Sequence, residues 1–584
     1  MKVLLISPPV GNIGQAPPSI SALAAWLTHL GHECIQWDLG LDAFHYFHST
    51  EYLSAAAAVV EQRCKKDASY SRSSLLEIAR STRRIASQIE TAKQILKQPG
   101  VESDIEKMVG SLGFIRDAGL LISSAHGLSR LSYSRFDMPG AQADWRSLAE
   151  AIRDRGRNIF IDYFREHSLA RIALASPHLV AVSVSYHSQL LPAFSLVVLI
   201  KEEFPELPVL LGGAFLKAVQ DDLTQMPSSV VPADGICIGD GEPTLEAYLR
   251  ALEERESIWQ TPNILLPRGE RFVSTGRIEQ ISLSQAPIPM LKMEGINLGS
   301  YLVPRYAIPL PVTRGCHYHR CVYCNISNQA REVYRAREAK RCIDDIESLV
   351  RECRTNWFDF PTDSVLPRDL ERFARTSIKR GLTIRWSAEV FLDRRLTDEI
   401  IALLARSGCC CLRFGLESAC PRTLELMDKR IDLKEVSRIL KTCHRHGIVT
   451  GVMMIIGFPT ETQRELLETV EYLQRHASDI DLLTLHPFTV SPGSRLASQP
   501  ELAGIHLLPR TAVLTPSLPY AHSNPVAMRP EDLSEVVSSL ADALSDFYPQ
   551  SGQLWASGIG GWLTFAACCT NDAAFFKQPM VAMR

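Results

Sequence analysis

The sequence lacks an excess of charge of either sign and lacks an apolar run long enough to cross a membrane. Its 62 basic and 65 acidic residues leave a formal net charge of -3, so electrostatics gives no reason to expect nucleic acid or an acidic lipid surface as a partner. The uncharged stretch 548–571 comes nearest to a membrane span, but its glycines and serines favour a buried docking segment. No membrane span is therefore expected.

The sequence also lacks an export signal, because the apolar run in MKVLLISPPVGNIG is stopped by Pro8 and Pro9. This run is predicted to be a buried first strand. Cysteines in a chain without an export signal indicate a reducing, cytoplasmic location, where clustered thiols more often bind metal than form disulfides. The glycine-rich stretch IGDGEP lacks the lysine and the serine or threonine of a P-loop, so no nucleoside triphosphatase is expected.

The 584 residues exceed what one hydrophobic core supports, and they indicate several domains. Residues 1–255 alternate strand-like and helix-like runs and are predicted to form a Rossmann-like domain with a doubly wound parallel sheet. A charged, helix-patterned stretch at about 50–165 is interpreted as a helical insertion in that domain. Residues 256–300 are predicted to be a connector with hairpin-like strands.

Six further strand-like runs, each followed by a helix-like run, occupy residues 301–500. Six units are too few for a closed eight-fold barrel, so the predicted fold class is α/β, with a partial, open (β/α)6 barrel after the Rossmann-like domain. Ligands of such folds lie at the C-terminal ends of the strands. Residues 501–584 are predicted to form a small C-terminal helical cap.

Three cysteines follow the first strand of the predicted barrel, in the stretch TRGCHYHRCVYCNI: Cys316, Cys321 and Cys324. Three thiolates can hold three irons of a [4Fe–4S] cluster and leave the fourth iron open to a substrate or cofactor. A structural zinc site is the alternative, with His317 or His319 as the fourth ligand. The residues alone leave both possibilities open.

In this context the chain resembles the radical S-adenosylmethionine (radical SAM) superfamily, in which a cysteine triplet after the first strand of a partial barrel binds such a cluster. The resemblance covers about residues 305–500 and includes Tyr323, the aromatic residue before the last cysteine, with RFGLES, GVMMIIGFPTET, LELMDKR and HPFTVSPGSRL. One departure is the spacing. Four residues separate Cys316 from Cys321, where the superfamily most often has three.

The resemblance implies that S-adenosylmethionine (SAM) coordinates the open iron, and that its reductive cleavage yields a radical able to abstract hydrogen from carbon. Polar residues at the strand ends are the candidates for binding SAM, together with Tyr323: Thr362, Asp363, Ser387, Glu389 and Glu417. Glu417 is the strongest candidate, because a carboxylate there can accept both ribose hydroxyls. The alternative is a structural carboxylate paired with Arg385 or Arg413.

The N-terminal domain resembles the cobalamin-binding domain that precedes the barrel in one large radical SAM subgroup. Small residues recur at successive strand ends and are the candidates to approach cobalamin: Ser183, Ser185, Gly212, Gly213, Gly239 and Gly241. The sequence lacks the Asp-x-His-x-x-Gly motif whose histidine ligates cobalt in many cobalamin enzymes, which agrees with that subgroup. His187 could approach the corrin ring, although a histidine beside a strand end is more often an ordinary polar contact.

Two groups of adjacent cysteines invite a metal interpretation that their spacing does not favour. Residues 409–411 enter the fourth barrel strand, where successive side chains point to opposite faces, so they are predicted to be buried small apolar residues. Cys568 and Cys569 lack the further spacing that a second cluster would need.

The prediction is a two-cofactor enzyme, a class B radical SAM C-methyltransferase that moves a methyl group from SAM, by way of methylcobalamin, to an unactivated carbon of a natural-product or peptide substrate. An electron donor such as flavodoxin or ferredoxin is implied. One alternative is a cobalamin-dependent rearrangement, ring contraction or cyclisation without methyl transfer. The other, from a different class, is a non-catalytic zinc- or corrin-binding module.

Overall fold

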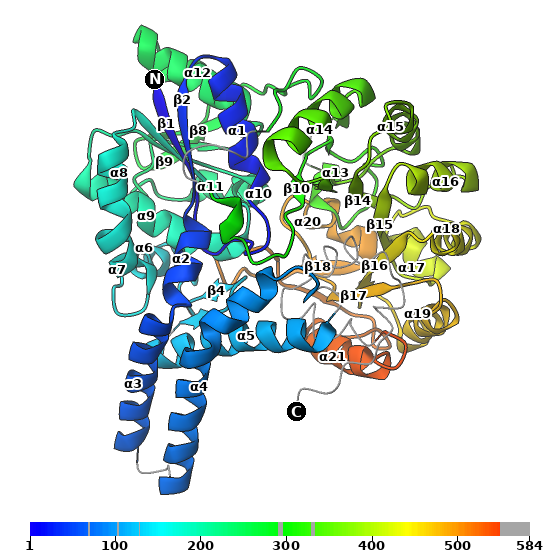
Figure 1. The fold of residues 1–584 in the computed structure, drawn as a ribbon, viewed down its shortest axis with the longest axis horizontal. Helices are drawn as coiled ribbons and strands as arrows, with labels where there is room; N and C mark the ends of the chain where they lie inside the picture. The colour runs from blue at the N-terminus through cyan, green and yellow to red at the C-terminus, as the bar shows by residue number, and fades with distance from the viewer. Residues whose placement is uncertain (68–70, 102–103, 128, 290–295, 329–332, 549–584) are drawn as a thin grey trace. The chain divides into compact units, whose positions relative to one another are not determined.

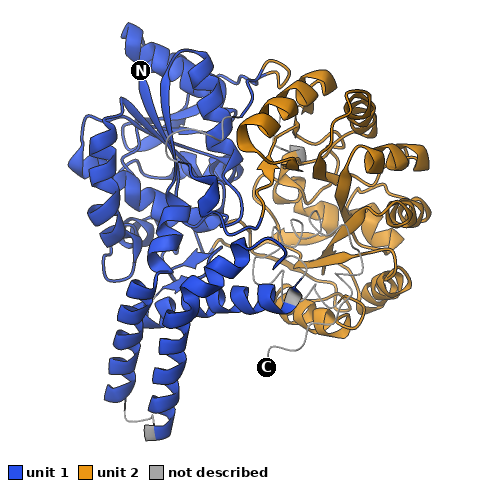
Figure 2. Cartoon of the chain, in the orientation of Figure 1, with its two compact units in different colours: residues 1–281, 286–304, 511–515 blue, residues 282–285, 305–510, 516–584 orange. Residues whose placement is uncertain are grey.

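The computed structural model describes residues 1–67, 71–101, 104–127, 129–289, 296–328 and 333–548. The chain divides into two compact units (Figure 2). Unit 1 comprises residues 1–281, 286–304 and 511–515, and unit 2 comprises residues 282–285, 305–510 and 516–584. The predicted docking segment after Tyr548, with Cys568 and Cys569, lies outside the described residues.

Unit 1 contains a seven-stranded sheet with the strand order β2-β1-β5-β6-β7-β8-β9 (Figure 1). In that order the strands are Glu33–Asp38, Lys2–Ser7, Leu179–Ser183, Val209–Gly212, Gly235–Cys237, Ile264–Arg268 and Arg271–Ser274. The first five are parallel, and β8 and β9 add an antiparallel hairpin at the edge. The predicted connector therefore contributes two strands to this sheet.

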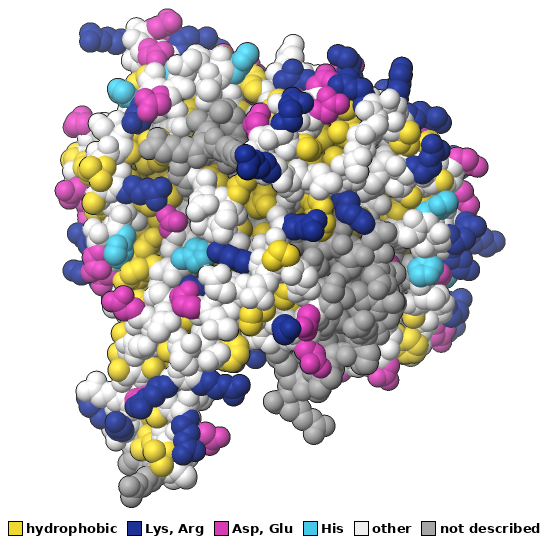
Figure 3. All heavy atoms as spheres, viewed as in Figure 1, with side chains coloured by type: hydrophobic (Ala, Val, Ile, Leu, Met, Phe, Trp, Pro, Cys, Tyr) yellow, Lys and Arg dark blue, Asp and Glu magenta, His cyan; other side chains and the backbone are white. Residues whose placement is uncertain are grey.

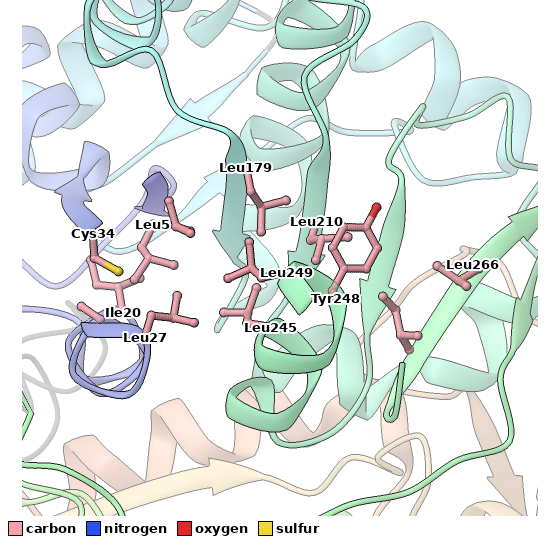
Figure 4. Close-up of a cluster of buried hydrophobic side chains, with 13 residues drawn as sticks. Leu5, Ile20, Leu27, Cys34, Leu179, Leu210, Leu245, Tyr248, Leu249 and Leu266 are labelled. Atoms are coloured by element: carbon pink, nitrogen blue, oxygen red, sulfur yellow. The ribbon is translucent and has the colours of Figure 1, made fainter. Parts of the chain in front are cut away.

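One face of this sheet is covered by α1 (Pro18–His29) and α12 (Gly241–Glu254). Apolar side chains from both helices and from five strands form one buried cluster, which Figure 4 shows, and the burial of such surface stabilises the fold. Trp26 Nε1 donates to Glu246 Oε2 at 3.1 Å and joins the two helices. A third helix, α9 (Leu190–Glu203), is buried along most of its length.

The described chain between β2 and β5 is mainly helical. Its long helices are α3 (Thr50–Lys66), α4 (Arg72–Lys97) and α5 (Ile105–His126), which pack against one another. Buried residues recur along α4 at the three- and four-residue spacing of a helix packed on one side: Thr82, Ala86, Ile89, Lys93 and Leu96. Figure 3 shows basic side chains gathered at the outer end of α3 and α4.

A short helix, α2 (Leu39–Phe47), precedes the long helices. Between the long helices and β5 lie further short elements: β3 (Arg130–Leu131), β4 (Phe136–Asp137), α6 (Trp145–Ala151), α7 (Phe160–Tyr163) and α8 (Leu169–Ala175). The helices α7 and α8 contact α9, which explains why α9 is buried beyond the face that a sheet alone would cover.

Unit 2 contains a six-stranded, all-parallel sheet with the order β10-β13-β14-β15-β16-β17. Its strands are Ile308–Pro309, Trp357–Phe360, Arg385–Val390, Cys409–Glu417, Val449–Ile456 and Leu482–Pro487. All six strands predicted from the sequence are present, and the order follows the chain. The predicted fold class is confirmed.

Amphipathic helices follow the strands of unit 2. They are α14 (Ala339–Cys353), α15 (Pro367–Lys379), α16 (Asp398–Arg406), α18 (Leu433–Arg445) and α19 (Gln463–Arg475). Each buries an apolar stripe, and α19 begins with a capping box in which Thr462 and Glu465 satisfy each other's backbone N–H groups. No helix in the described ranges is both long and apolar enough to span a bilayer.

The described part of the C-terminal region is only partly helical. It contains the helix α21 (Leu533–Ala543) and a hairpin of β18 (Ile505–Leu507) and β19 (Tyr520–His522). Between these two strands the chain returns to unit 1 over Thr511–Thr515.

Candidate functional site

The three cysteines lie on one loop at the C-terminal end of the first barrel strand. The loop leaves β11 (Thr313–Arg314) through Gly315, whose φ is +75°, and ends at α13 (Asn325–Asn328). All three thiols are free of disulfides, and Cys321 is buried while Cys316 and Cys324 are half-buried. Among the residues that the structure describes, no three His, Cys, Asp or Glu side chains gather closely enough to hold a single metal ion.

Two side chains between Cys316 and Cys321 are anchored to other parts of unit 2. The Tyr318 ring stacks on Phe391 with 4.4 Å between centroids, and its hydroxyl donates to Asp428 O at 2.7 Å and accepts from Arg430 N at 2.8 Å. His317 Nδ1 lies 3.1 Å from Ser364 Oγ. The residues between the first two cysteines are therefore fixed by contacts with neighbouring elements of unit 2.

The sequence LELMDKR holds the same loop from the other side. Val322 N donates to Met427 O at 3.1 Å, and Val322 O accepts from Leu496 N at 3.0 Å. The carboxylate of Asp428 forms ion pairs with three arginines: Arg320 at 3.5 Å, Arg430 at 3.3 Å and Arg495 at 3.3 Å. This loop is fixed by backbone bonds and by charge.

Glu417, the strongest SAM candidate, is held in an unusual backbone conformation at the end of β15. Its φ is +69°, and a register shift separates it from Gly415. Its Oε1 accepts from Lys429 Nζ at 2.8 Å. A Cβ at Gly415 would lie 2.3 Å from Glu417 Oε1 and 2.9 Å from Lys429 Nζ, so this glycine leaves the space that the ion pair fills. Strained non-glycine backbone of this kind gathers at functional sites.

Lys429 links Glu417 to the cysteine loop. Its side chain is 5% exposed, and Nζ lies 3.4 Å from the Tyr323 hydroxyl. Burial alone would lower the pKa of Lys429, but Glu417 and the thiols of Cys321 and Cys324 oppose it, and the pKa is raised. Burial raises the pKa of the Cys321 thiol to about 12, against the attraction of Lys429. Lys429 belongs to LELMDKR, one of the stretches that carry the resemblance, but the sequence alone did not indicate its contact with Glu417.

Three strands bring the other charged candidates together on the inner face of the sheet. Arg413 on β15 pairs with Asp359 at 3.2 Å and with Glu389 at 3.4 Å, and Ser387 Oγ donates to Asp359 Oδ1 at 2.6 Å. Burial raises the pKa of Glu389, with Arg413 opposing, although 41% of its side chain is exposed. Neighbouring protein atoms therefore partly desolvate the Glu389 carboxylate, although much of its side chain still contacts solvent. Arg413 does not pair with Glu417 among the described contacts.

The remaining SAM candidates make backbone contacts. Thr362 Oγ1 donates to Glu389 O at 3.1 Å, and Asp363 Oδ2 accepts from Gly315 N at 2.9 Å. Asp363 thus joins the end of β13 to the start of the cysteine loop. The structure brings a group of candidates together at the C-terminal ends of the strands: Tyr323, Asp363, Glu389 and Glu417. Ser387 lies two residues before Glu389 on β14, in register with Asp359.

A second wall of the same face is less charged. Gly415 is in register with Met453 on β16, Met453 with Thr484 on β17, and Ile455 with His486. Side chains two residues apart share a face, so His486 lies on the inner face at the strand end. Its side chain reaches solvent, but the surrounding protein partly desolvates the ring and lowers the pKa of the His486 imidazole, against the attraction of Glu417. His486 was not among the predicted site residues, although it begins HPFTVSPGSRL, one of the stretches that carry the resemblance.

The cobalamin candidates in unit 1 lie at the C-terminal ends of β5, β6 and β7, but their small size already has a use within the protein. A Cβ at Gly212 would lie 3.1 Å from Cys237 Cβ, and one at Gly213 would lie 2.3 Å from Val184 O. A Cβ at Gly239 would lie 2.7 Å from Asn263 Cγ, and one at Gly241 would lie 3.0 Å from Leu23 Cδ2. Ser183 Oγ donates to Ser19 Oγ at 3.0 Å, and Ser185 N donates to Gln189 Oε1 at 2.8 Å.

The cysteine run Cys409, Cys410 and Cys411 at the start of β15 is 5%, 0% and 0% exposed. The Cys410 thiol donates to Trp386 O at 3.2 Å. The prediction that these residues are buried small side chains is confirmed.

Comparison with known proteins finds similarity over the region that contains this site. Residues 310–473 match the model of the Radical SAM superfamily. An uncharacterized methyltransferase of Pyrococcus horikoshii is 28% identical over 276 residues, 45% of this chain and 57% of that protein. An anaerobic magnesium-protoporphyrin IX monomethyl ester cyclase of Rubrivivax gelatinosus is 29% identical over 168 residues, 28% of this chain and 30% of that protein. The chain therefore matches roughly a third to a half of the length of such relatives.

Solved structures extend the similarity of the fold beyond the barrel. The methyltransferase TsrM from Kitasatospora setae, solved with tryptophan substrate and a SAM analogue, has a TM-score of 0.56 and 15% identity, over 94% of this chain and 89% of that one. The cobalamin-dependent enzyme OxsB, solved with aqua-cobalamin and SAM, has a TM-score of 0.55 and 14% identity, over 68% and 64%. The family match covers residues 310–473 of this chain. The overall fold is similar to that of cobalamin-dependent radical SAM enzymes, as the sequence resemblance implied.

Proposed function

We propose that this protein is a cobalamin-dependent radical SAM enzyme that methylates an unactivated carbon. The observation that carries the proposal is the joining of the three-thiol loop to Glu417 through Lys429 and Tyr323, at the strand ends of a six-stranded parallel sheet. Relatives named as methyltransferases, including a bacteriochlorophyllide methyltransferase of Chlorobaculum tepidum that is 23% identical over 274 residues, support it.

Cys316, Cys321 and Cys324 would hold a [4Fe–4S] cluster, because three thiols on a fixed loop are the donor set that such a cluster uses. The hydrogen bonds that Gly315 N donates to Asp363 Oδ2 and Val322 N donates to Met427 O would keep the loop in place during turnover. When bound, the cluster, SAM and cobalamin would together supply hydrogen abstraction from carbon and a transferable methyl group.

Glu417 would accept hydrogen bonds from the SAM ribose, and Lys429 would hold its carboxylate in place for this contact. Glu389, exposed beside Arg413, would face the same ligand. The less charged wall with Met453, Ile455 and His486 would remain for the substrate. In this arrangement the protein positions its ligands and excludes water, which is its expected share in cofactor chemistry.

The net reaction would convert one substrate C–H group and two molecules of SAM into a methylated product, S-adenosylhomocysteine, 5′-deoxyadenosine and methionine. Two electrons would come from a donor such as flavodoxin or ferredoxin. A small molecule or a peptide would be the substrate. The tryptophan bound to TsrM is consistent with a small molecule.

A second candidate is cyclisation or another rearrangement without methyl transfer. It is favoured by the relatives named as anaerobic magnesium-protoporphyrin IX monomethyl ester cyclases, one of them 26% identical over 275 residues. The two candidates differ in their products, because only the first consumes a methyl group.

The test is anaerobic reconstitution with iron and sulfide, followed by incubation with methyl-deuterated SAM, methylcobalamin, a low-potential reductant and candidate substrates. We expect a brown protein that forms 5′-deoxyadenosine and a deuterium-labelled product, and a variant with all three cysteines changed to alanine that forms neither. Deoxyadenosine with an unlabelled, altered product would favour rearrangement. A colourless protein that binds zinc would support the non-catalytic module and refute both enzymatic proposals.

A further inference from the structure

Lys429 places an ammonium group between the cysteine loop and the end of β15. Its Nζ donates to Glu417 Oε1 at 2.8 Å, lies 3.4 Å from the Tyr323 hydroxyl and lies 5.5 Å from the centre of the Phe391 ring. The same Phe391 ring stacks on Tyr318, which belongs to the cysteine loop. A carboxylate, a hydroxyl and an aromatic face therefore hold this cation in one position.

The charge of Lys429 acts at full strength because the side chain is buried. Only 5% of it is exposed, so water and salt screen its field little. The other basic side chains that form ion pairs beside the loop, Arg320, Arg430 and Arg495, are 47%, 69% and 33% exposed, and all three share the carboxylate of Asp428. Their charge is partly cancelled and is screened by solvent. Lys429 thus carries a positive charge that is screened far less than theirs.

The thiols feel the ammonium of Lys429 more strongly than the carboxylate of Glu417. Burial is the largest influence on the pKa of the Cys321 thiol and raises it to about 12, and Lys429 lowers that pKa more than Glu417 raises it. A hydrogen bond from the Tyr323 hydroxyl also lowers the Cys321 pKa. The positive end of the ion pair therefore lies on the side of the cysteine loop.

Reduction of a [4Fe–4S] cluster adds one negative charge, here from a donor such as flavodoxin or ferredoxin, and the potential at which this happens depends on the charges and hydrogen bonds around the cluster. A buried cation stabilises the reduced form, and a buried anion destabilises it. We propose that Lys429 raises the reduction potential of the cluster held by the three thiols, and that Glu417 limits this rise. This inference rests on the proposed function.

The test is a redox titration of the anaerobically reconstituted, full-length protein without SAM, in which electron paramagnetic resonance follows the reduced cluster. Lys429→Met removes the charge at nearly the same side-chain length. We expect a tenfold or greater fall in the ratio of reduced to oxidised cluster at a fixed potential, which corresponds to a shift of about 59 mV to lower potential. Glu417→Gln should shift the midpoint to higher potential by a smaller amount. Lys441→Met, at an exposed lysine of α18, is the matched control and should leave the midpoint unchanged.

Opposite shifts from the two halves of one ion pair separate an effect of charge from loosened packing, which would move both variants in the same direction. An unchanged midpoint in Lys429→Met, or shifts of the same sign in both variants, would overturn the inference, while the cluster is still present and the proposed function stands. If the wild-type protein forms no four-iron cluster, the proposed function fails and this inference fails with it. If Lys429→Met loses its cluster, Lys429→Gln, which keeps a hydrogen-bond donor, replaces it and must show the same shift to lower potential.

Discussion

In unit 2 the residues at the strand ends carry charge and pair with one another, whereas in unit 1 the ends of β5 and β6 and the loop after β7 carry glycine and serine. Glu417 is bonded to Lys429, and Arg413 to Asp359 and Glu389. At Gly213 the protein backbone itself fills the space where a side chain would be. The comparison shows that unit 2 holds paired charges at its strand ends, the arrangement on which the proposed SAM site rests, while unit 1 uses small residues to pack its own loops closely.

The largest effect should come from Gly213→Ala in unit 1. Its φ of +112° is a region that only glycine adopts readily, and a Cβ would lie 2.3 Å from the backbone oxygen of Val184. Because backbone must move, we expect a loss of about 3 kcal/mol or more in the free energy of unfolding. Urea denaturation checks this, and a loss within error of zero would show that unit 1 tolerates a side chain there.

Gly415→Ala in unit 2 should act differently, because the atoms that its Cβ meets are the ends of the Glu417 and Lys429 side chains. The fold should survive, while displacement of the ion pair weakens SAM binding by about tenfold or more, ~1.4 kcal/mol. Equilibrium dialysis of SAM with the reconstituted protein measures this. Gly110→Ala, at a glycine with open space around it, is the control. Unchanged SAM affinity in Gly415→Ala would argue against Glu417 as a SAM ligand.

A buried acid in unit 1 should make stability depend on pH. Burial raises the pKa of Asp38 from 3.8 to about 7, against the hydrogen bond from Tyr301. Between these values the folded protein keeps a proton that the unfolded chain has lost, so this group lowers stability by about 1.4 kcal/mol per pH unit as the pH rises. Asp38→Asn should therefore flatten the fall of the melting temperature from acidic to neutral pH. Parallel curves for the two proteins would contradict the assignment.

The smallest effect should come from Tyr318→Phe in the cysteine loop. The change removes a hydroxyl that bonds Asp428 O and Arg430 N, and should cost about 1 kcal/mol, because water can replace the bond at the exposed Arg430 N. Tyr548→Phe, which removes one bond to Leu473 O elsewhere in unit 2, is the control. Both should lower the melting temperature, but only Tyr318→Phe should also reduce the iron retained after reconstitution. Equal iron contents would show that the loop does not need this anchor.

Much of the fold could be predicted from the sequence, because each barrel strand is a short apolar run followed by a helix with one apolar stripe. The cysteine loop was predicted from three cysteines that follow the first barrel strand, together with the family resemblance of the stretches around it. The contact of Lys429 could not be predicted, because Lys429 lies 12 residues after Glu417 and only the fold of the chain between them brings the two side chains together. The hairpin of β18 and β19 was also missed, since its strands are three residues each and their pairing joins segments far apart in the loop.

The return of Thr511–Thr515 to unit 1 also bears on how this chain can be divided. A fragment that ends near residue 304 would contain every strand of the first sheet but would lack the carbonyl groups that hold Gln142 and the buried side chain of Leu514. A separately expressed barrel would carry that segment with its apolar residue uncovered. Each unit is built from several separate segments of the chain, so we expect neither to fold properly when it is expressed as one continuous fragment.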